Sequence, residues 1–172
     1  MTPLPLNQPT MIQTNNSQSV RHKEFANDVI IPEIARLLDE GHSVTLTLRG
    51  VSMRPFLEDG RDKAILTKPS KPVRVGDVVL AEVSSRRYAL HRIVKIEGSL
   101  VTMRGDGNLA TEQFDASKVL GIARCFYRKG RKRPDYTTGW KWRAYSTVWT
   151  ALLPVRRYLL FAYRMTLKLK HK

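Results

Sequence analysis

The sequence predicts a mainly β protein of the α+β class, in which a folded antiparallel sheet is preceded by one helix and followed by two basic helices. Six short segments between residues 43 and 129 have strand-like patterns, and turn-like sequences without helical period separate them. After residue 129 the composition becomes basic and aromatic, and the period becomes helical. Consecutive strands without crossover helices favour antiparallel pairing.

The first predicted element is an amphipathic helix over residues 27–40. Its apolar residues recur at helical spacing: Ile30, Ile34, Leu37 and Leu38. Gly41 is suited to end the helix, whereas Pro32 is compatible with it only in the first turn. Residues 1–21 lack the basic start and the apolar run of a signal peptide, and we expect this segment to be disordered.

Six strands are predicted after the helix. In SVTLTLR, residues 43–49, Val44, Leu46 and Leu48 alternate with polar residues, as in a half-buried strand. The other five segments are 63–67, 77–83, 87–97, 100–104 and 119–129. Together with the helix they predict one domain over residues 22–129.

The charge is concentrated at the C-terminal end of the chain. Residues 1–123 carry 16 Lys/Arg and 14 Asp/Glu, a net charge of +2, whereas residues 124–172 carry 14 and 1, a net charge of +13. A basic, aromatic tail is therefore predicted over residues 130–172, with two helical segments separated by Pro154.

Composition also bounds the cellular setting. The single cysteine, Cys125, excludes an internal disulfide and gives no sign of an oxidising compartment. No stretch has the roughly 18 uncharged apolar residues of a spanning helix. The expected location is cytoplasmic, or peripheral at the inner face of the membrane.

The segment GVSMRPFLEDG, residues 50–60, follows the first strand and contains Ser52. Ser52 is either a polar turn residue or a nucleophile, and a nucleophilic serine needs a base that accepts its proton. His91 lies within the segment YALHRIVKIEG, where strand alternation places it on the same face as Ala89 and Ile93. A histidine held there is either a packed strand residue or the base that Ser52 requires.

A combination of motifs links the two residues. GVSMRPFLEDGRDKAIL, VGDVVLAEV, LHRIVKIEG and MRGDGN occur in this order between residues 44 and 123, and together they resemble the peptidase domain of signal peptidase I and LexA-type self-cleaving repressors. The sequence His91-Arg92-Ile93 resembles the branch with a histidine base, found in archaeal and eukaryotic signal peptidases. The resemblance implies the signal-peptidase/LexA-like fold, Ser52 as nucleophile, His91 as general base and an oxyanion hole of nearby main-chain N–H groups.

A histidine base is normally oriented by a carboxylate, and two candidates are present. Asp106 lies in GDGN, which resembles the GDNN box of the family, and is otherwise a hairpin turn residue. Glu112 lies where the histidine branch usually has a second acid, an aspartate, and is otherwise a solvated loop acid. The longer glutamate departs from the family pattern and shifts the position of the carboxylate.

The predicted function is a serine endopeptidase that cleaves a peptide or protein substrate. The alternative is a catalytically inactive peptide-binding module of the same fold, gripping an extended peptide by strand addition. No metal-ligand spacing and no phosphate-binding loop is present, so no cofactor or metal is expected.

The tail over residues 140–172 interleaves aromatic and cationic residues. Such a segment suits an anionic membrane surface, and nucleic acid is a less favoured partner. Helices that only cover the sheet and leave a solvated basic face are the third interpretation.

Overall fold

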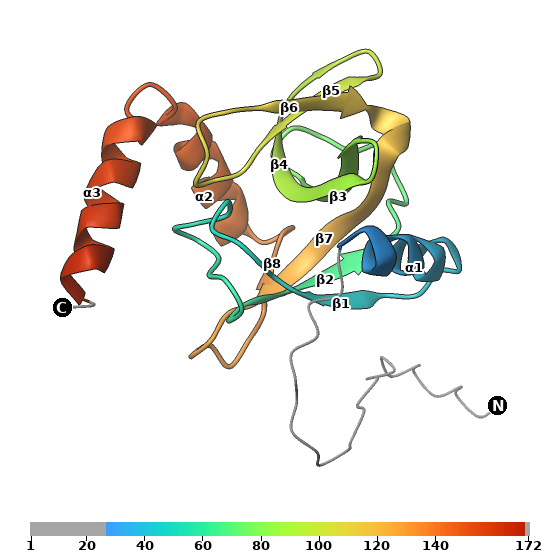
Figure 1. Cartoon of the computed structure of the whole chain (residues 1–172), viewed down its shortest axis with the longest axis horizontal. Helices are drawn as coiled ribbons and strands as arrows, with labels where there is room; N and C mark the ends of the chain where they lie inside the picture. The colour runs from blue at the N-terminus through green and yellow to red at the C-terminus, as the bar shows by residue number, and fades with distance from the viewer. Residues whose placement is uncertain (1–26, 171–172) are drawn as a thin grey trace.

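The computed structural model describes residues 27–170, which form an α+β protein built on an antiparallel sheet of eight strands with three α-helices (Figure 1). The predicted disorder of residues 1–21 lies outside the described residues. The strand order is β1-β2-β7-β3-β4-β5-β6, every neighbouring pair is antiparallel, and β8 pairs with β7. The strands are β1 Val44–Thr47, β2 Lys63–Thr67, β3 Val78–Ser84, β4 Arg87–Glu97, β5 Leu100–Arg104, β6 Glu112–Asp115, β7 Val119–Tyr127 and β8 Asp135–Tyr136.

The six predicted strands are present as β1 to β5 and β7. Two further strands were not predicted. β6 has only four residues, and its one buried side chain, Phe114, leaves no readable alternation. β8 has two residues within the basic segment 130–139, and it pairs Tyr136 with Cys125 of β7. The sheet therefore continues past residue 129, where the strand pattern ends in the sequence.

Helix α1 spans Asn27–Asp39 and ends as predicted at Gly41. Gly41 has a φ of +84° and donates to the carbonyl of Leu38, while His42 donates to that of Leu37, the pattern of a glycine-terminated helix. The prediction that Pro32 lies in the first turn is wrong, because it is the sixth residue of α1 and lies in the second turn. Burial of Ile31 and Leu38 against the sheet offsets the hydrogen bond that the proline removes.

The apolar interior consists of two clusters on opposite faces of the sheet. The first lies beneath α1 and includes Leu38, Leu66 and Phe126, and the second includes Ile93 and Met103. Trp142, from the predicted tail, belongs to the first cluster and is only 4% exposed. The tail therefore contributes to the core.

The two predicted tail helices are α2 Trp140–Ala151 and α3 Arg156–Lys170, with Pro154 between them. In Figure 1, α3 lies at the end of the molecule opposite α1, and α2 lies between α3 and the sheet. Within residues 27–170, no helix has the length and apolar character needed to cross a membrane.

Candidate active site

The Ser52 loop, residues 50–60, is closed at its base by main-chain hydrogen bonds. Gly60 donates to the carbonyl of Leu48, and the amide of Leu48 donates to the carbonyl of Asp62, at 2.8 and 2.9 Å. Within the loop, Met53 and Leu57 point into the first core cluster and are almost fully buried. These anchors hold the half-buried Ser52 in a fixed position beside the sheet.

Ser52 lines a cleft of about 920 Å³. His91, Asn108 and Glu112 line the same cleft. Apolar side chains from three elements complete its walls: Ile31 of α1, Leu46 of β1, and Tyr88 and Leu90 of β4. Arg49, Asp59 and Arg87 also line it, so the cleft is about equally polar and apolar.

The main-chain carbonyl of Ser52 and the ring of His91 both lie beside Gly105. A Cβ atom on Gly105 would lie 2.4 Å from the carbonyl oxygen of Ser52 and 3.0 Å from Nε2 of His91. The side-chain nitrogen Nδ2 of Asn108 would also lie at 3.0 Å from that atom. Only glycine leaves room for these groups to converge. The amide of Gly107 donates to the same Ser52 carbonyl at 2.7 Å, which ties the 105–108 turn to the Ser52 loop.

His91 is 5% exposed and is paired with an acid at its other nitrogen. Its Nδ1 lies 2.7 Å from Oε2 of Glu112, and the second oxygen of Glu112 accepts from Arg87 at 3.0 Å. A donor at Nδ1 leaves Nε2 as the proton acceptor of the neutral ring, on the side of Ser52 and Gly105. Of the two predicted orienting acids, Glu112 is the one within hydrogen-bond distance of His91.

Asp106 is paired with the next residue of β4. Arg92 donates to both oxygens of Asp106, at 2.9 and 2.8 Å, and both side chains are only 1% exposed. Successive strand residues point to opposite faces, so Arg92 and His91 serve opposite sides of β4. The structure therefore brings Ser52, His91 and Glu112 together at the cleft and places Asp106 behind it.

Helix α2 supports Asp106 and Arg92 from behind. Ser146 accepts from Arg92 at 2.8 Å, and the indole of Trp149 donates to the carbonyl of Asp106 at 3.1 Å. Burial raises the pKa of Tyr145 far above its ordinary value, and the Asp106 carboxylate adds to that rise. The hydroxyl of Tyr145 therefore stays protonated as it donates to Asp106 at 3.4 Å.

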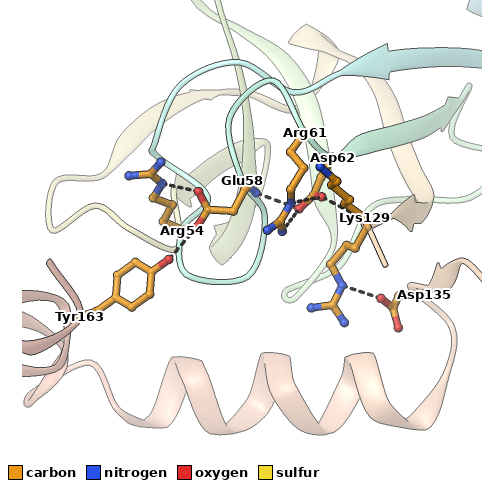
Figure 2. A network of polar contacts seen from close by, with 8 residues as sticks. Arg54, Glu58, Arg61, Asp62, Lys129, Asp135 and Tyr163 are labelled. Carbon is orange, nitrogen blue, oxygen red and sulfur yellow. Dashed lines mark hydrogen bonds and ion pairs between the residues drawn. The ribbon is translucent and has the colours of Figure 1, made fainter. Parts of the chain in front are cut away.

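The far side of the Ser52 loop is held by a second polar network (Figure 2). Tyr163 of α3 donates to one oxygen of Glu58 at 2.6 Å, and Arg54 forms an ion pair with the other oxygen at 2.8 Å. Asp62, fully buried just beyond the loop, accepts from the main-chain amides of Glu58 and Lys129 at 2.9 and 3.2 Å. Arg61 adds two further hydrogen bonds to the Asp62 carboxylate.

Sequence reasoning missed the supporting residues from the tail, Tyr145, Ser146, Trp149 and Tyr163. Tyr145, Ser146 and Trp149 are spaced so that they share one face of α2, and Tyr163 belongs to α3, but nothing in the sequence indicates which surface either helix covers. Asn108 was also missed as a site residue, although it lies within the MRGDGN motif.

The polar groups at the cleft are those of acid-base and nucleophilic chemistry. Among residues 27–170, no group of three or more His, Cys, Asp and Glu side chains is arranged to hold a metal ion. No model of a known protein family matches this chain, and no curated protein matches it.

Proposed function

We propose that the protein is a serine endopeptidase in which Ser52 is the nucleophile, His91 the general base and Glu112 the residue that orients His91. The observation that carries the proposal is the pairing of His91 Nδ1 with Glu112 at 2.7 Å, while Nε2 faces the spot beside Gly105 that the main chain of Ser52 also borders. All three residues line one cleft.

In the first half of the reaction, Oγ of Ser52 attacks the carbonyl carbon of the scissile peptide bond, and Nε2 of His91 accepts the hydroxyl proton. Glu112 stabilises the imidazolium that forms. When the carbon–nitrogen bond breaks, His91 transfers the proton to the leaving amine, and the acyl group remains on Ser52 as an ester.

In the second half, a water molecule takes the place of the amine. His91 accepts a proton from this water as its oxygen attacks the ester carbon. The carbon–oxygen bond to Ser52 then breaks, the proton returns to Oγ, and a carboxylic acid leaves. The two steps together add one water molecule across the peptide bond.

Asn108 is our candidate for stabilising the negative oxygen of the tetrahedral intermediate. Its Nδ2 borders the same spot beside Gly105 as Nε2 of His91. A fixed amide donor is most effective where charge develops in a partly buried site. Asp106 then acts through the main chain, because its pairing with Arg92 fixes the turn that carries Gly105 and Asn108.

The motif order over residues 44–123 supports the proposal, since it resembles the peptidases of the signal-peptidase and LexA type with a histidine base. On this interpretation the sheet adopts their fold. Glutamate at position 112 takes the place of the usual aspartate, and the 2.7 Å contact indicates that its longer side chain still reaches His91.

One observation favours the alternative, a peptide-binding module without activity. β1 is the terminal strand of the sheet path, and the cleft is lined on that side by Leu46, Thr47 and Leu48. An extended peptide can pair with such an edge and place alternate side chains against the apolar wall. Binding of this kind requires no chemistry at Ser52.

The test is to incubate the full chain with a proteome-derived peptide library and to identify new N-termini by mass spectrometry. Ser52→Ala and His91→Ala are the informative variants, and Ser70→Ala, an exposed loop serine, is the matched control. We expect cleavage with the wild type and the control and none with the two site variants. Intact mass of the chain itself identifies self-cleavage. Peptide binding that is equal in wild type and Ser52→Ala, with no new termini from either, would refute the peptidase and favour the binding module.

A further inference from the structure

Helix α3 has one face on the body of the protein. Leu160 is only 4% exposed, Arg156 is buried over the ring of Trp149, and Tyr163 donates to Glu58 of the Ser52 loop. These three residues are spaced four and three apart, so they form one stripe of the helix. The orientation of α3 about its own axis is therefore set by its contacts with the body.

The opposite face of α3 is apolar and open. Tyr158, Phe161, Met165 and Leu169 follow one another at spacings of three and four residues, and Phe161 and Leu169 are 66% and 71% exposed. Four large apolar side chains in one exposed row exceed what a solvated helix requires. We call these four residues the outer stripe.

Cations border the outer stripe. Arg157 and Arg164, seven residues apart, are both exposed and lie on the helix between the buried stripe and the outer stripe. The sequence contains no Asp or Glu after Asp135, so no acid on α2 or α3 offsets these charges. A second basic surface is formed by Lys132 and Arg133, on the segment that precedes α2, and by the 75% exposed Trp140, the first residue of α2.

We propose that the outer stripe of α3 docks on an anionic lipid bilayer, with the helix lying in the plane of the interface. An apolar row bordered by arginines matches the two layers of such a surface, acyl chains below and anionic headgroups above. A second copy of the chain would bring two strongly basic tails together at a cost in repulsion. Nucleic acid would use the cations but leave the outer stripe in water.

Docking of this kind fixes the position of the cleft relative to the membrane. The inner face of α3 contacts the Ser52 loop through Tyr163 and Glu58, so the loop is held at a set distance from the bilayer. The proposal concerns binding and not catalysis, and it stands or fails independently of the peptidase.

The test is co-sedimentation of the full chain with vesicles of equal parts phosphatidylcholine and phosphatidylglycerol, and with vesicles of phosphatidylcholine alone. The stripe variant is Phe161→Ser with Met165→Ser, which leaves the charge unchanged. The charge variant is Arg157→Gln with Arg164→Gln, and its matched control is Lys71→Gln with Arg74→Gln, which removes two exposed cations elsewhere. All of these side chains lie largely outside the core, so each variant should fold. Thermal melts check this.

We expect the wild type to bind the anionic vesicles, and the charge variant to bind them on the order of 25-fold more weakly, since each of the two surface cations contributes about fivefold. The stripe variant should lose at least about tenfold. The matched control should stay close to the wild type, and high salt should weaken all binding.

Three results would overturn the proposal. One is equal vesicle binding by the wild type and the stripe variant. Another is binding of a mixed-sequence DNA duplex, but not of vesicles, by nuclease-treated protein. The third is a wild-type dimer in sedimentation velocity that the stripe variant dissociates, with no vesicle binding.

Discussion

Nδ1 of His91 lies 2.7 Å from Oε2 of Glu112, and the other oxygen of the same carboxylate is held by Arg87. The glutamate is thus fixed at both oxygens before any substrate binds. If His91 is the base, this pairing determines which ring nitrogen is free to accept the proton of Ser52.

Glu112→Gln should therefore lower kcat by about a thousandfold or more, because the amide can donate to Nδ1 and stabilise the wrong tautomer. KM and the melting temperature should change little. Glu97→Gln, an exposed acid on β4, is the control and should have wild-type rates. A Glu112→Gln enzyme with near-normal kcat would remove Glu112 from the mechanism.

Asn108→Ala should lower kcat by about a hundredfold, the usual effect of removing one donor from an oxyanion hole. Because the change acts on the transition state, peptide binding measured with Ser52→Ala should be the same with and without it. Steady-state kinetics together with that binding measurement test the role. A variant in which only binding changes would assign Asn108 to substrate recognition.

Asp106→Asn should destabilise the protein by about 3–5 kcal/mol, because Arg92 is then left buried without a full counter-charge. Glu97→Gln breaks the exposed pair with Lys95 and should change stability by less than about 1 kcal/mol. Urea unfolding monitored by circular dichroism compares the two. Equal losses of stability in the two variants would show that the buried Arg92–Asp106 pair stabilises the protein no more than the exposed Lys95–Glu97 pair.

The Asp62 carboxylate gives a prediction about pH. Burial alone would raise its pKa, but hydrogen bonds from Arg61 and from the amides of Glu58 and Lys129 outweigh burial and lower the pKa below its usual value. A folded-state pKa below the unfolded value means that the carboxylate stabilises the fold above about pH 4, and that this contribution is lost as the pH falls through the folded-state pKa.

The stability gap between the wild type and Asp62→Asn should therefore be largest at neutral pH and shrink below about pH 4. In Arg61→Gln, Asp62 keeps its two main-chain donors. The loss of stability relative to the wild type should therefore be smaller than in Asp62→Asn. Urea unfolding at a series of pH values measures both. A gap that is independent of pH would contradict the assigned role of the Asp62 charge.

Removal of the tail helices tests how far the domain extends. A chain that ends at residue 139 loses Trp142, which stacks on Phe126 at 4.8 Å between ring centres, and Trp149, which bonds to Asp106. Deleting a buried tryptophan side chain alone costs about 3–5 kcal/mol, so this chain should lose its cooperative thermal transition. A chain that ends at residue 154 keeps α2 and should retain the transition. If the tail from residue 130 is instead a separate unit, as the sequence predicts, the chain that ends at residue 139 should retain the transition.

The strands could be predicted because short apolar or alternating segments stand between clear turns. Helix α1 could be predicted because its apolar residues recur at helical spacing and Gly41 marks its end. The partner of His91 could not be chosen from the sequence. Asp106 and Glu112 both follow β5, and which of them reaches His91 depends on the pairing of Met103 with Glu112 across β5 and β6. Since β6 was not predicted, that pairing could not be foreseen.

The packing of α2 against the sheet could not be predicted from the sequence for a different reason. An aromatic, basic helix has the same composition whether its aromatic residues pack on a sheet or contact a membrane. Trp142 and Trp149 are buried against the body, whereas Trp140, only two residues before Trp142, is exposed. The difference arises from the surface that α2 meets, and this surface is formed by Phe56, Phe126 and Arg92, which are distant in the sequence.

Because the side chains of His91 and Arg92 point in opposite directions, the number of residues in β4 is also constrained. One residue faces the cleft and the next faces α2, and β4 is paired on both sides, with β3 through Val78 and Val79 and with β5 through Met103 and Arg104. Deleting a single residue upstream within β4 would shift Arg92 into the position of His91 and leave an arginine in the cleft. A one-residue deletion upstream of His91 should therefore abolish the site, whereas substitution of an exposed residue of β4 such as Lys95 should not.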